Sequence, residues 1–323
     1  MNHTITRVPG IEVGHYTDLE AATGCTVILC RPGAVGGVDV RGSAPETRNT
    51  DLLRPVHLVQ QAHAVVLSGG SSFGLDAASG VIHCLEKQGI GFPTGVSVNP
   101  IVAAAVLFDL AVGRPDVRPG VADGFAACQA ANDGPVPEGC VGAGTGATAG
   151  KLLGPQFATK TGLGSAARRI GGDITVGALV AVNPYGDVVD PETGRIMAGT
   201  RDPQGQGFVD TMARLHGDLS QYTIGFPTNT TIACVATDAV LSKEEANKMA
   251  QMAHDGLARA IRPIHTMFDG DTVFALATGL REGVAANITV IGAVAAAVLA
   301  EAVVRAAQQA TSLAGISAAR DLS

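Results

Sequence analysis

The order of secondary-structure elements in the last third of the chain restricts its fold more than any other feature of the sequence. The β-branched and small apolar residues 231–235 predict a half-buried strand. A capping box that starts at Ser242 begins an amphipathic helix, which ends before Pro263. Residues 273–277 predict another strand, and an alanine-rich helix is expected from about 287 to 309. This strand, helix, strand, helix order predicts an α/β fold.

Small residues add a second constraint on the fold. The chain has 323 residues with 42 glycines, and only 16% of the residues are charged and 4% aromatic. Small side chains let backbones approach closely, so this composition suits a tightly layered protein. No linker is visible, and the length permits one large domain or two. The net charge is -7 without a cluster of Lys or Arg, which argues against a nucleic-acid or anionic-membrane surface and leaves small substrates open.

Shorter strand and helix signals fill the rest of the chain. Thr50 is a candidate N-cap for a helix over residues 52–62. Residues 199–225 have little periodicity and are expected to form a surface loop. The other expected elements are strands at 11–16, 25–30, 35–40, 64–67, 103–110 and 174–183, and helices from about 75 to 87 and over 125–131.

Several classes of protein are disfavoured by what the sequence lacks. The six cysteines show no C-x-x-C and no Cys–His spacing of a zinc site, so we expect buried thiols in a reducing, cytoplasmic protein without a metal or other cofactor. Residues 1–10 lack the charged and apolar regions of a signal peptide. The apolar segment 290–300 is shorter than the roughly 20 residues that span a bilayer, so we expect a buried helix.

Two glycine-rich segments are candidates for anion binding. The first, Ser68–Leu75, joins a strand to a helix and includes Ser71 and Ser72, so its backbone N–H groups could hold an oxyanion or simply form a tight packing turn. The second, Val141–Lys151, does not match a phosphate loop or a dinucleotide fingerprint in its spacing. It ends in a lysine that could place a positive charge in a pocket or lie in solvent.

Thr230 stands where a turn enters the strand 231–235. A threonine there is usually chosen for its β propensity. If the bond before it were cut, however, a free α-amine would lie beside its hydroxyl, and an amine with a pKa of about 8 can accept the hydroxyl proton near neutral pH. Residue 230 is therefore a candidate nucleophile that carries its own base.

Asp269-Gly270-Asp271 places two carboxylates on one turn before the strand 273–277. An Asp-Gly turn is the simple interpretation, and no acidic residue stands where a calcium loop needs its twelfth ligand. Two adjacent buried carboxylates repel each other, so at least one needs a cationic partner such as an amine or Lys151. This turn is therefore a second candidate site.

Together these segments resemble a family of self-processing peptidases. The family includes L-aminopeptidase/D-esterase, the β-peptidyl aminopeptidases and the nylon-oligomer (aminohexanoate-oligomer) endohydrolase. The likeness runs nearly from end to end, and its motifs are specific only in combination. They are Gly10–Tyr16, Leu67–Leu75, Gly142–Gly144, Ala149–Lys151, Asn183–Pro184, Gly225–Thr231 and Asp269–Thr272.

The resemblance implies a fold and a maturation step. The fold is the four-layer αββα sandwich of N-terminal-nucleophile hydrolases, formed by residues 1–323 as a single domain. Cleavage is implied between Asn229 and Thr230, giving chains 1–229 and 230–323 that stay associated. A homo-oligomer, a tetramer of such processed protomers, is also implied.

The resemblance also assigns roles to residues that match the family's motifs. Thr230 is the nucleophile, Lys151 the lysine near it, and Asn183 the asparagine that binds the oxyanion with a backbone N–H. Asp269 and Asp271 match the carboxylates near the new amine. Substrate contacts are expected at Phe108, Ser71 and Ser72, and Phe108 departs from the tyrosine of the nylon-oligomer endohydrolase, so a hydroxyl is lost there.

The function implied is amide hydrolysis of a small amide or peptide substrate. A threonine nucleophile is similar to that of the nylon-oligomer endohydrolase, so oligomers of ω-amino acids are the expected substrates. An exo-acting aminopeptidase for β- or small α-amino acid amides is the alternative, and it needs an acidic pocket for the substrate ammonium. A catalytically silent binding or assembly protein of the same fold is a third hypothesis, which predicts an intact chain without turnover.

Overall fold

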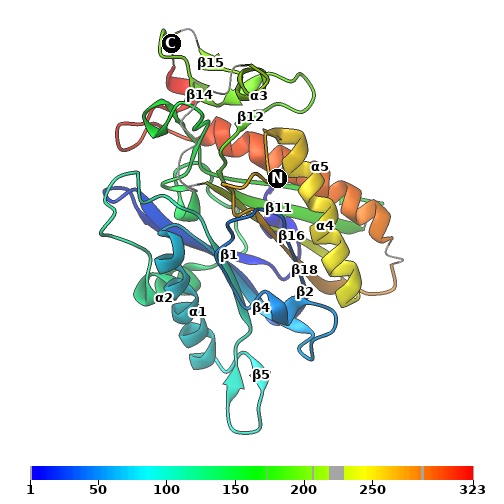
Figure 1. The fold of residues 1–323 in the computed structure, drawn as a ribbon. Coiled ribbons are helices and arrows are strands. Elements are labelled where there is room, and N and C mark those ends of the chain that lie inside the picture. The colour runs from blue at the N-terminus through cyan, green and yellow to red at the C-terminus, as the bar shows by residue number, and fades with distance from the viewer. Residues whose placement is uncertain (1, 172, 206, 218–228, 285–286, 323) are drawn as a thin grey trace.

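The computed structural model describes residues 2–171, 173–205, 207–217, 229–284 and 287–322. Its centre is a nine-stranded sheet, whose path runs β10-β11-β16-β18-β2-β4-β7-β3, with β1 paired to β2 (Figure 1). These strands are β1 (Glu12–Asp18), β2 (Thr23–Val40), β3 (Thr47–Arg48), β4 (Gln61–Ser68), β7 (Val102–Val106), β10 (Leu163–Ile170), β11 (Ile174–Asn183), β16 (Thr230–Ala239) and β18 (Thr272–Arg281).

The long strand β2 joins two halves of this sheet. Its first part pairs with β1 and β4, and its last part, from Val35 to Val40, pairs with β18. The pairing with β4 shifts register between Leu29 and Ala34. A bulge of this kind bends a strand and increases its twist, which lets the two halves face each other.

Helices cover the outer face of each half. Figure 1 shows α1 and α2 on one side of the sheet and α4 and α5 on the other. The four helices are α1 (Asp76–Lys87), α2 (Val121–Ala130), α4 (Lys243–Ala260) and α5 (Ile288–Gln309). The layers therefore follow the order helix, sheet, sheet, helix, as predicted. The smaller elements are β5 (Phe92–Pro93), β6 (Val98–Asn99), β8 (Thr148–Ala149), β9 (Thr159–Lys160), β12 (Asp187–Val189), β13 (Ile196–Ala198), β14 (Thr200–Arg201), β15 (Phe208–Val209), β17 (Ile261–Arg262) and α3 (Thr211–Leu215).

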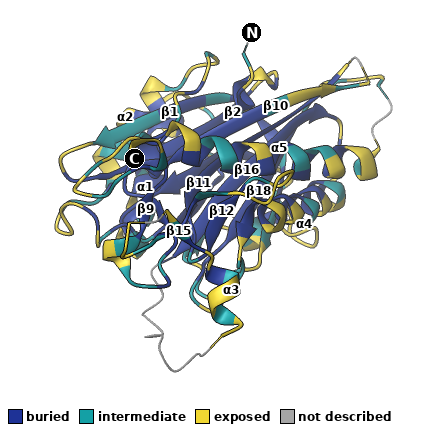
Figure 2. Ribbon diagram, turned by 90° about the horizontal axis from the view of Figure 1, so that it is seen from above, coloured by how far each residue is buried: buried dark blue, intermediate teal, exposed yellow. Residues whose placement is uncertain are grey.

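Three hydrophobic cores fill the spaces between these four layers. In β16, Ile232 and Cys234 face the core between the two sheet halves, whereas Ala233 and Val235 face the core under α4 and α5. Side chains of a strand alternate between its faces, so a strand buried on both sides is apolar throughout. The third core packs β2 and β4 against α1 and α2. Figure 2 shows the strands buried and the outer helix faces exposed.

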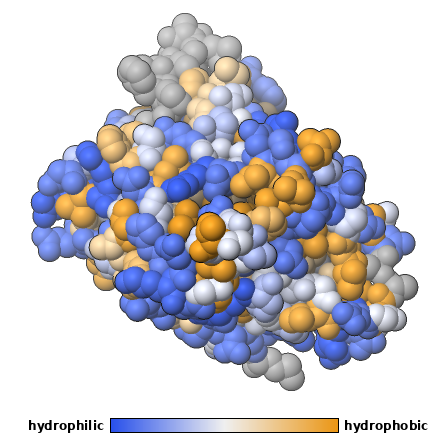
Figure 3. Space-filling model, turned by 90° about the horizontal axis from the view of Figure 1, so that it is seen from below, coloured by the Kyte–Doolittle hydropathy of each residue, from blue (hydrophilic) through white to orange (hydrophobic). Residues whose placement is uncertain are grey.

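Helix α5 is long and apolar enough by composition to cross a bilayer. Half of that apolar window is buried against the rest of the structure, which is the pattern of a core helix. The most exposed large apolar side chains lie elsewhere, at Val56, Leu58 and Val96, with 82 to 94% of their surface in solvent. Figure 3 shows one face of the surface, on which hydrophobic residues form small groups among hydrophilic ones.

The structure corrects three sequence-based predictions of secondary structure. The expected strands 25–30 and 35–40 are one strand, β2. The expected helix 52–62 is wrong, because Pro55 lacks an N–H and keeps Arg54 extended, and only a short 3-10 turn at Asp51–Leu53 forms. The expected loop 199–225 contains β14, β15 and α3, whereas its last part and the turn 225–228 lie outside the described residues.

The close packing of α4 on α5 generates a stability prediction. A Cβ added at Gly256 would lie 2.2 Å from the carbonyl oxygen of Ala296 on α5. Gly256→Ala should therefore lower the free energy of unfolding by about 1–3 kcal/mol, although alanine favours a helix by about 1 kcal/mol. Urea unfolding measures this loss.

The matched control is Gly120→Ala, whose added Cβ would meet nothing closer than Asp123 Oδ2 at 3.9 Å. Gly120 is the N-cap residue of α2, where glycine is preferred over alanine, so we expect a loss of no more than about 1 kcal/mol, without the clash at Gly256. Equal stability of the two variants would contradict the packing described here.

Candidate active site

Strand pairing brings the widely separated candidate residues together. Asn183 at the end of β11 lies opposite Thr230 at the start of β16 in the antiparallel register. Strand β18 runs parallel to β16, with Thr272 beside Ile232. The Asp269–Asp271 turn that precedes β18 therefore lies beside Asn229 and Thr230, and Asn229 forms a bridge with Asp269.

The peptide bond between Asn229 and Thr230 is buried at this junction. Thr230 is only 5% exposed, and its hydroxyl donates a hydrogen bond to the carbonyl oxygen of Asn229. The backbone N–H of Gly270 donates to the same carbonyl oxygen over 3.2 Å. A hydroxyl and a backbone donor thus meet at the carbonyl whose cleavage the sequence predicts.

Gly270 is a functional candidate that the sequence did not single out. A Cβ there would lie 2.5 Å from the carbonyl oxygen of Ala44 and 2.9 Å from Thr230 Oγ1. Only glycine lets this N–H approach the carbonyl of Asn229 so closely. The glycine between two aspartates is the signal in the sequence, but by itself it predicts only a turn.

The side chain of Asn183 is held in one orientation. Its Oδ1 accepts hydrogen bonds from Lys151 Nζ at 2.8 Å and from the backbone N–H of Thr148 at 3.0 Å. Its Nδ2 donates to the carbonyl oxygen of Phe108 over 2.9 Å. Donors on one side and an acceptor on the other distinguish the two ends of the amide. The amide N–H end, which an oxyanion would need, is therefore fixed.

Lys151 carries the positive charge nearest to this asparagine. Its Nζ also donates to the backbone oxygen of Asn183 over 3.0 Å. Burial, with a smaller contribution from the positive charge of Lys160, lowers the pKa of Lys151 to about 7, although the negative charge of Asp269 opposes this shift. Lys151 can therefore exchange a proton near neutral pH, which a surface lysine cannot do.

Asp269 and Asp271 are both fully buried. Asp269 accepts hydrogen bonds from the backbone N–H of Tyr185 at 3.1 Å and from the hydroxyl of Thr266. Burial, followed by the charge of Asp271, raises the pKa of Asp269 to about 6. Asp271 accepts from the N–H of Thr231 at 2.7 Å. The two carboxylates thus flank the position at which cleavage would create an amine.

A cavity of about 250 Å³ lies next to the Asn183 amide. Phe108, Thr148 and Lys151, which hydrogen-bond to the Asn183 side chain, all line this cavity. The remaining described lining is mostly apolar and carries no carboxylate. It consists of Ala111, Val112, Pro155, Gln156, Ala314 and Ile316. The contribution of the C-terminal residues Ala314 and Ile316 could not be read from the sequence.

The serines predicted to bind substrate do not line this cavity. Ser71 donates its hydroxyl to Glu46 Oε2 over 2.9 Å, and Ser72 is exposed. The N–H of Gly70 in the same turn donates to Asp109 Oδ1 over 2.7 Å. This turn therefore binds an internal carboxylate, and a contact of Ser71 or Ser72 with substrate stays a prediction.

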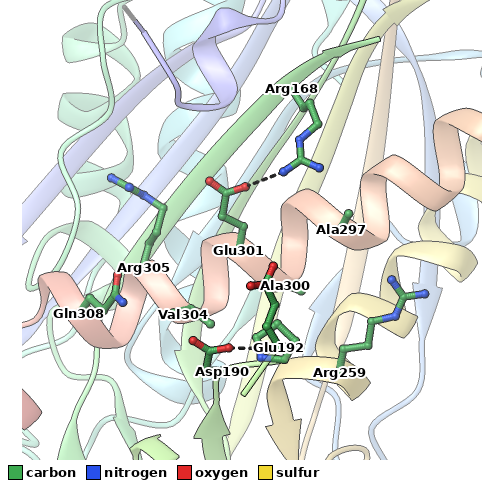
Figure 4. A pocket seen from close by; sticks show the side chains of 11 residues that line it. Arg168, Asp190, Glu192, Arg259, Ala297, Ala300, Glu301, Val304, Arg305 and Gln308 are labelled. Carbon is green, nitrogen blue, oxygen red and sulfur yellow. Dashed lines mark hydrogen bonds and ion pairs between the residues drawn. The ribbon is translucent and has the colours of Figure 1, made fainter. Parts of the chain in front are cut away.

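A second hollow, shown in Figure 4, contains none of the predicted site residues. Its volume is about 450 Å³, and it lies along α5. Arginines and carboxylates alternate around it, and Arg168 points toward Glu301 at 3.3 Å. This mixture of charges favours no single class of ligand. Among the described residues, no three His, Cys, Asp or Glu side chains cluster as metal ligands would.

Comparisons with known proteins find similar sequences over nearly the whole chain. A profile described as Peptidase family S58 matches residues 3–320. An uncharacterized aminopeptidase of Mycobacterium tuberculosis is 43% identical over 99% of this chain and 98% of its own length. A 6-aminohexanoate-oligomer endohydrolase of a Kocuria species is 34% identical over 93% of this chain and 84% of its own length.

Solved structures show the same fold at lower identity. A β-aminopeptidase of a Burkholderia species has a TM-score of 0.70 and 24% identity, covering 98% of this chain and 91% of its own. The L-aminopeptidase D-Ala-esterase/amidase of Ochrobactrum anthropi, described as a variant of the Ntn hydrolase fold, has a TM-score of 0.70 and 21% identity, covering 96% and 87%. The predicted fold class is therefore confirmed.

The lowered pKa of Lys151 predicts how stability changes with pH. Between about pH 7 and its ordinary value of 10.5, Lys151 has lost its proton in the folded chain but keeps it in the unfolded chain. The unfolded state then binds more protons, so this residue makes stability rise with pH in that window. Lys151→Met should remove that part of the rise, as measured by urea midpoints at several pH values.

Both proteins in this comparison should carry Thr230→Ala, so that neither chain can be cut. The other titrating groups then contribute equally to the pH dependence of both proteins. Parallel stability curves for the two proteins would show that Lys151 is not the buried, proton-exchanging amine described here.

Proposed function

Since the chain belongs to peptidase family S58 and is an amide hydrolase with the N-terminal-nucleophile fold, we propose that it cuts itself before Thr230 and uses this threonine as its nucleophile. The observation that carries the proposal is the meeting of the Thr230 hydroxyl and the Gly270 N–H at the carbonyl of Asn229. An attacking oxygen and a donor for the developing negative charge are the two groups that amide cleavage needs.

Self-cleavage would follow from this arrangement. Thr230 Oγ1 attacks the carbonyl carbon of Asn229 and its proton passes to the leaving nitrogen, so the peptide bond becomes an ester. Water then hydrolyses the ester, leaving a carboxylate on Asn229 and a free α-amine on Thr230. Holding the groups together in one chain can lower the barrier by roughly 7–11 kcal/mol relative to a bimolecular encounter. The chains would be 1–229 and 230–323.

Substrate hydrolysis would repeat the same chemistry. The new amine of Thr230 accepts the hydroxyl proton as Oγ1 attacks a substrate amide, and returns it to the leaving nitrogen. The Asn183 amide and the Gly270 N–H are the proposed oxyanion donors, each worth roughly 3–4 kcal/mol. Below about pH 7, where Lys151 keeps its proton, its positive charge favours the neutral, basic form of the amine, because a nearby positive charge disfavours a second one.

We propose oligomers of ω-amino acids, such as 6-aminohexanoate oligomers, as substrates. The cavity beside Asn183 supports this choice, because its apolar walls suit a chain of methylene groups and its one described charge is Lys151. No described carboxylate of this cavity would bind a substrate ammonium, and below about pH 7 the ammonium would meet the like charge of Lys151, so cleavage inside an oligomer is favoured. The similarity to a 6-aminohexanoate-oligomer endohydrolase supports the same substrate class.

An exo-acting aminopeptidase on β- or small α-amino acid amides is the second candidate. It is favoured by the relative at 43% identity that is named an aminopeptidase. Glu46 supplies a carboxylate for this function. It lies in the same segment as Arg41 and Ala44, whose backbone N–H groups donate hydrogen bonds to the carbonyl oxygens of Asp271 and Asp269. Glu46 is held by the Ser71 hydroxyl and could accept a substrate ammonium.

Assembly and location complete the proposal. Association of processed protomers into a tetramer rests on the family resemblance. A cytoplasmic location is supported by the cysteines, which are all free and of which Cys140 alone is not fully buried.

Blocking the substrate amine separates the two candidates. A linear 6-aminohexanoate oligomer and its N-acetylated form should be hydrolysed at comparable kcat/KM by an endo-acting enzyme. A site built to bind the ammonium would reject the blocked oligomer by roughly 10⁴-fold. Chromatography of the products measures both rates.

Glu46→Gln is the matched variant for this experiment. Endo cleavage predicts unchanged kinetics on both oligomers, because the substrate ammonium needs no partner. If Glu46→Gln raises the KM for the free-amine oligomer and the blocked oligomer is not cleaved, the protein is an exo-acting aminopeptidase instead.

A further inference from the structure

Two histidines that the proposed mechanism does not use lie directly behind Asp271. His265 Nδ1 lies 2.8 Å from Asp271 Oδ2, and the backbone N–H of His265 donates to the same oxygen over 3.0 Å. The rings of His265 and His254 meet edge to face, with centroids 4.8 Å apart and planes at 71°. His254 is fully buried on α4, whereas the side chain of His265 is 18% exposed.

Asp271 connects this histidine pair to the nucleophile. Its other oxygen, Oδ1, accepts the backbone N–H of Thr231 over 2.7 Å. Thr231 is the residue after Thr230, so this bond sets where the first peptide of β16 lies. A carboxylate can make both bonds well only in one orientation, which the two donors of His265 define.

The backbone of His265 is held in an unusual conformation. Its φ is +57°, a left-handed value that only a few per cent of non-glycine residues adopt, with Asn, Asp and His the most frequent among them. Strain of this kind persists only where the surroundings over-determine it, and it gathers at functional sites. Here the conformation points both N–H donors of one residue at a single carboxylate oxygen.

The electrostatics of the pair suit this role. Burial, together with the charge of His265, lowers the pKa of His254 to about 4, so His254 stays neutral near neutral pH. The other charged groups that face His254 are Asp39, whose carbonyl oxygen lies 3.0 Å from its Nε2, and Arg41. Neutral His254 backs the His265 ring without adding charge beside the two aspartates.

We propose that His265 is a positioning residue for the threonine nucleophile. It holds Asp271 in the orientation that receives the Thr231 N–H, and so places the hydroxyl and the future amine of Thr230. This inference rests on the proposed function and adds a residue that neither the sequence motifs nor the comparisons point to.

The test compares three substitutions of His265. His265→Ala should lower kcat and the rate of self-cleavage by roughly 100-fold with little change in KM, as a misplaced reacting group does. His265→Asn tolerates the left-handed backbone and keeps a donor near the place of Nδ1, so it should recover most of that loss. His265→Gln puts its donor one bond further out and should not recover it.

Two controls make the result decisive. Thermal unfolding of all variants shows whether activity follows stability, and the Asn and Gln variants carry the test if the Ala variant does not fold. Asp39→Asn changes the far end of the histidine pair without touching Asp271, so its turnover should equal that of the wild type.

The outcomes separate this inference from the function beneath it. A wild-type protein that neither cuts itself nor hydrolyses amides overturns the proposed function and this inference with it. An active wild type accompanied by an equally active His265→Ala, or by Asn and Gln variants that lose activity only in step with stability, overturns the positioning role alone.

Discussion

The pairing of β16 between β11 and β18 is the constraint on which the candidate site depends. It places Thr230 opposite Asn183 and beside the Asp269–Asp271 turn. A shift of one residue would turn every side chain of β16 to the other face. The alternation of Ile232 and Cys234 with Ala233 and Val235 between two cores opposes such a shift, so the apolar packing also fixes the position of the nucleophile.

Burial affects the protonation of the site's ionisable groups as much as charge pairing does. Two enclosed aspartates and one largely enclosed lysine lie around a bond that carries no charge before cleavage. Burial shifts the pKa of Asp269 to about 6 and that of Lys151 to about 7, which brings both near the working range of an α-amine. The site can therefore accept the amine that cleavage would create, because its own groups can give up or take protons there.

The sequence predicted the layers of the fold well and their details less well. Strand and helix signals at 174–183 and from Thr231 onward were strong, because β11 and β16 are apolar on both faces and Ser242 caps α4 with a side-chain bond. The helix expected after Thr50 does not form, because Pro55 lacks an N–H group and keeps Arg54 extended. This local effect outweighs the apolar pattern. Family motifs indicated the candidate residues and included Gly270, but the contact of its N–H with Asn229 and the cavity wall at Ile316 arise from tertiary packing, which leaves no local pattern.

The central claim is that Thr230 becomes a nucleophile by cutting its own chain. Mass spectrometry of the denatured protein tests it most directly, comparing the wild type with Thr230→Ala after equal incubation. The account predicts two chains, 1–229 and 230–323, in the wild type, and one uncut chain without amide hydrolysis in the variant. A wild type that hydrolyses amides as an intact chain of 323 residues, or a variant that is still active, would contradict it.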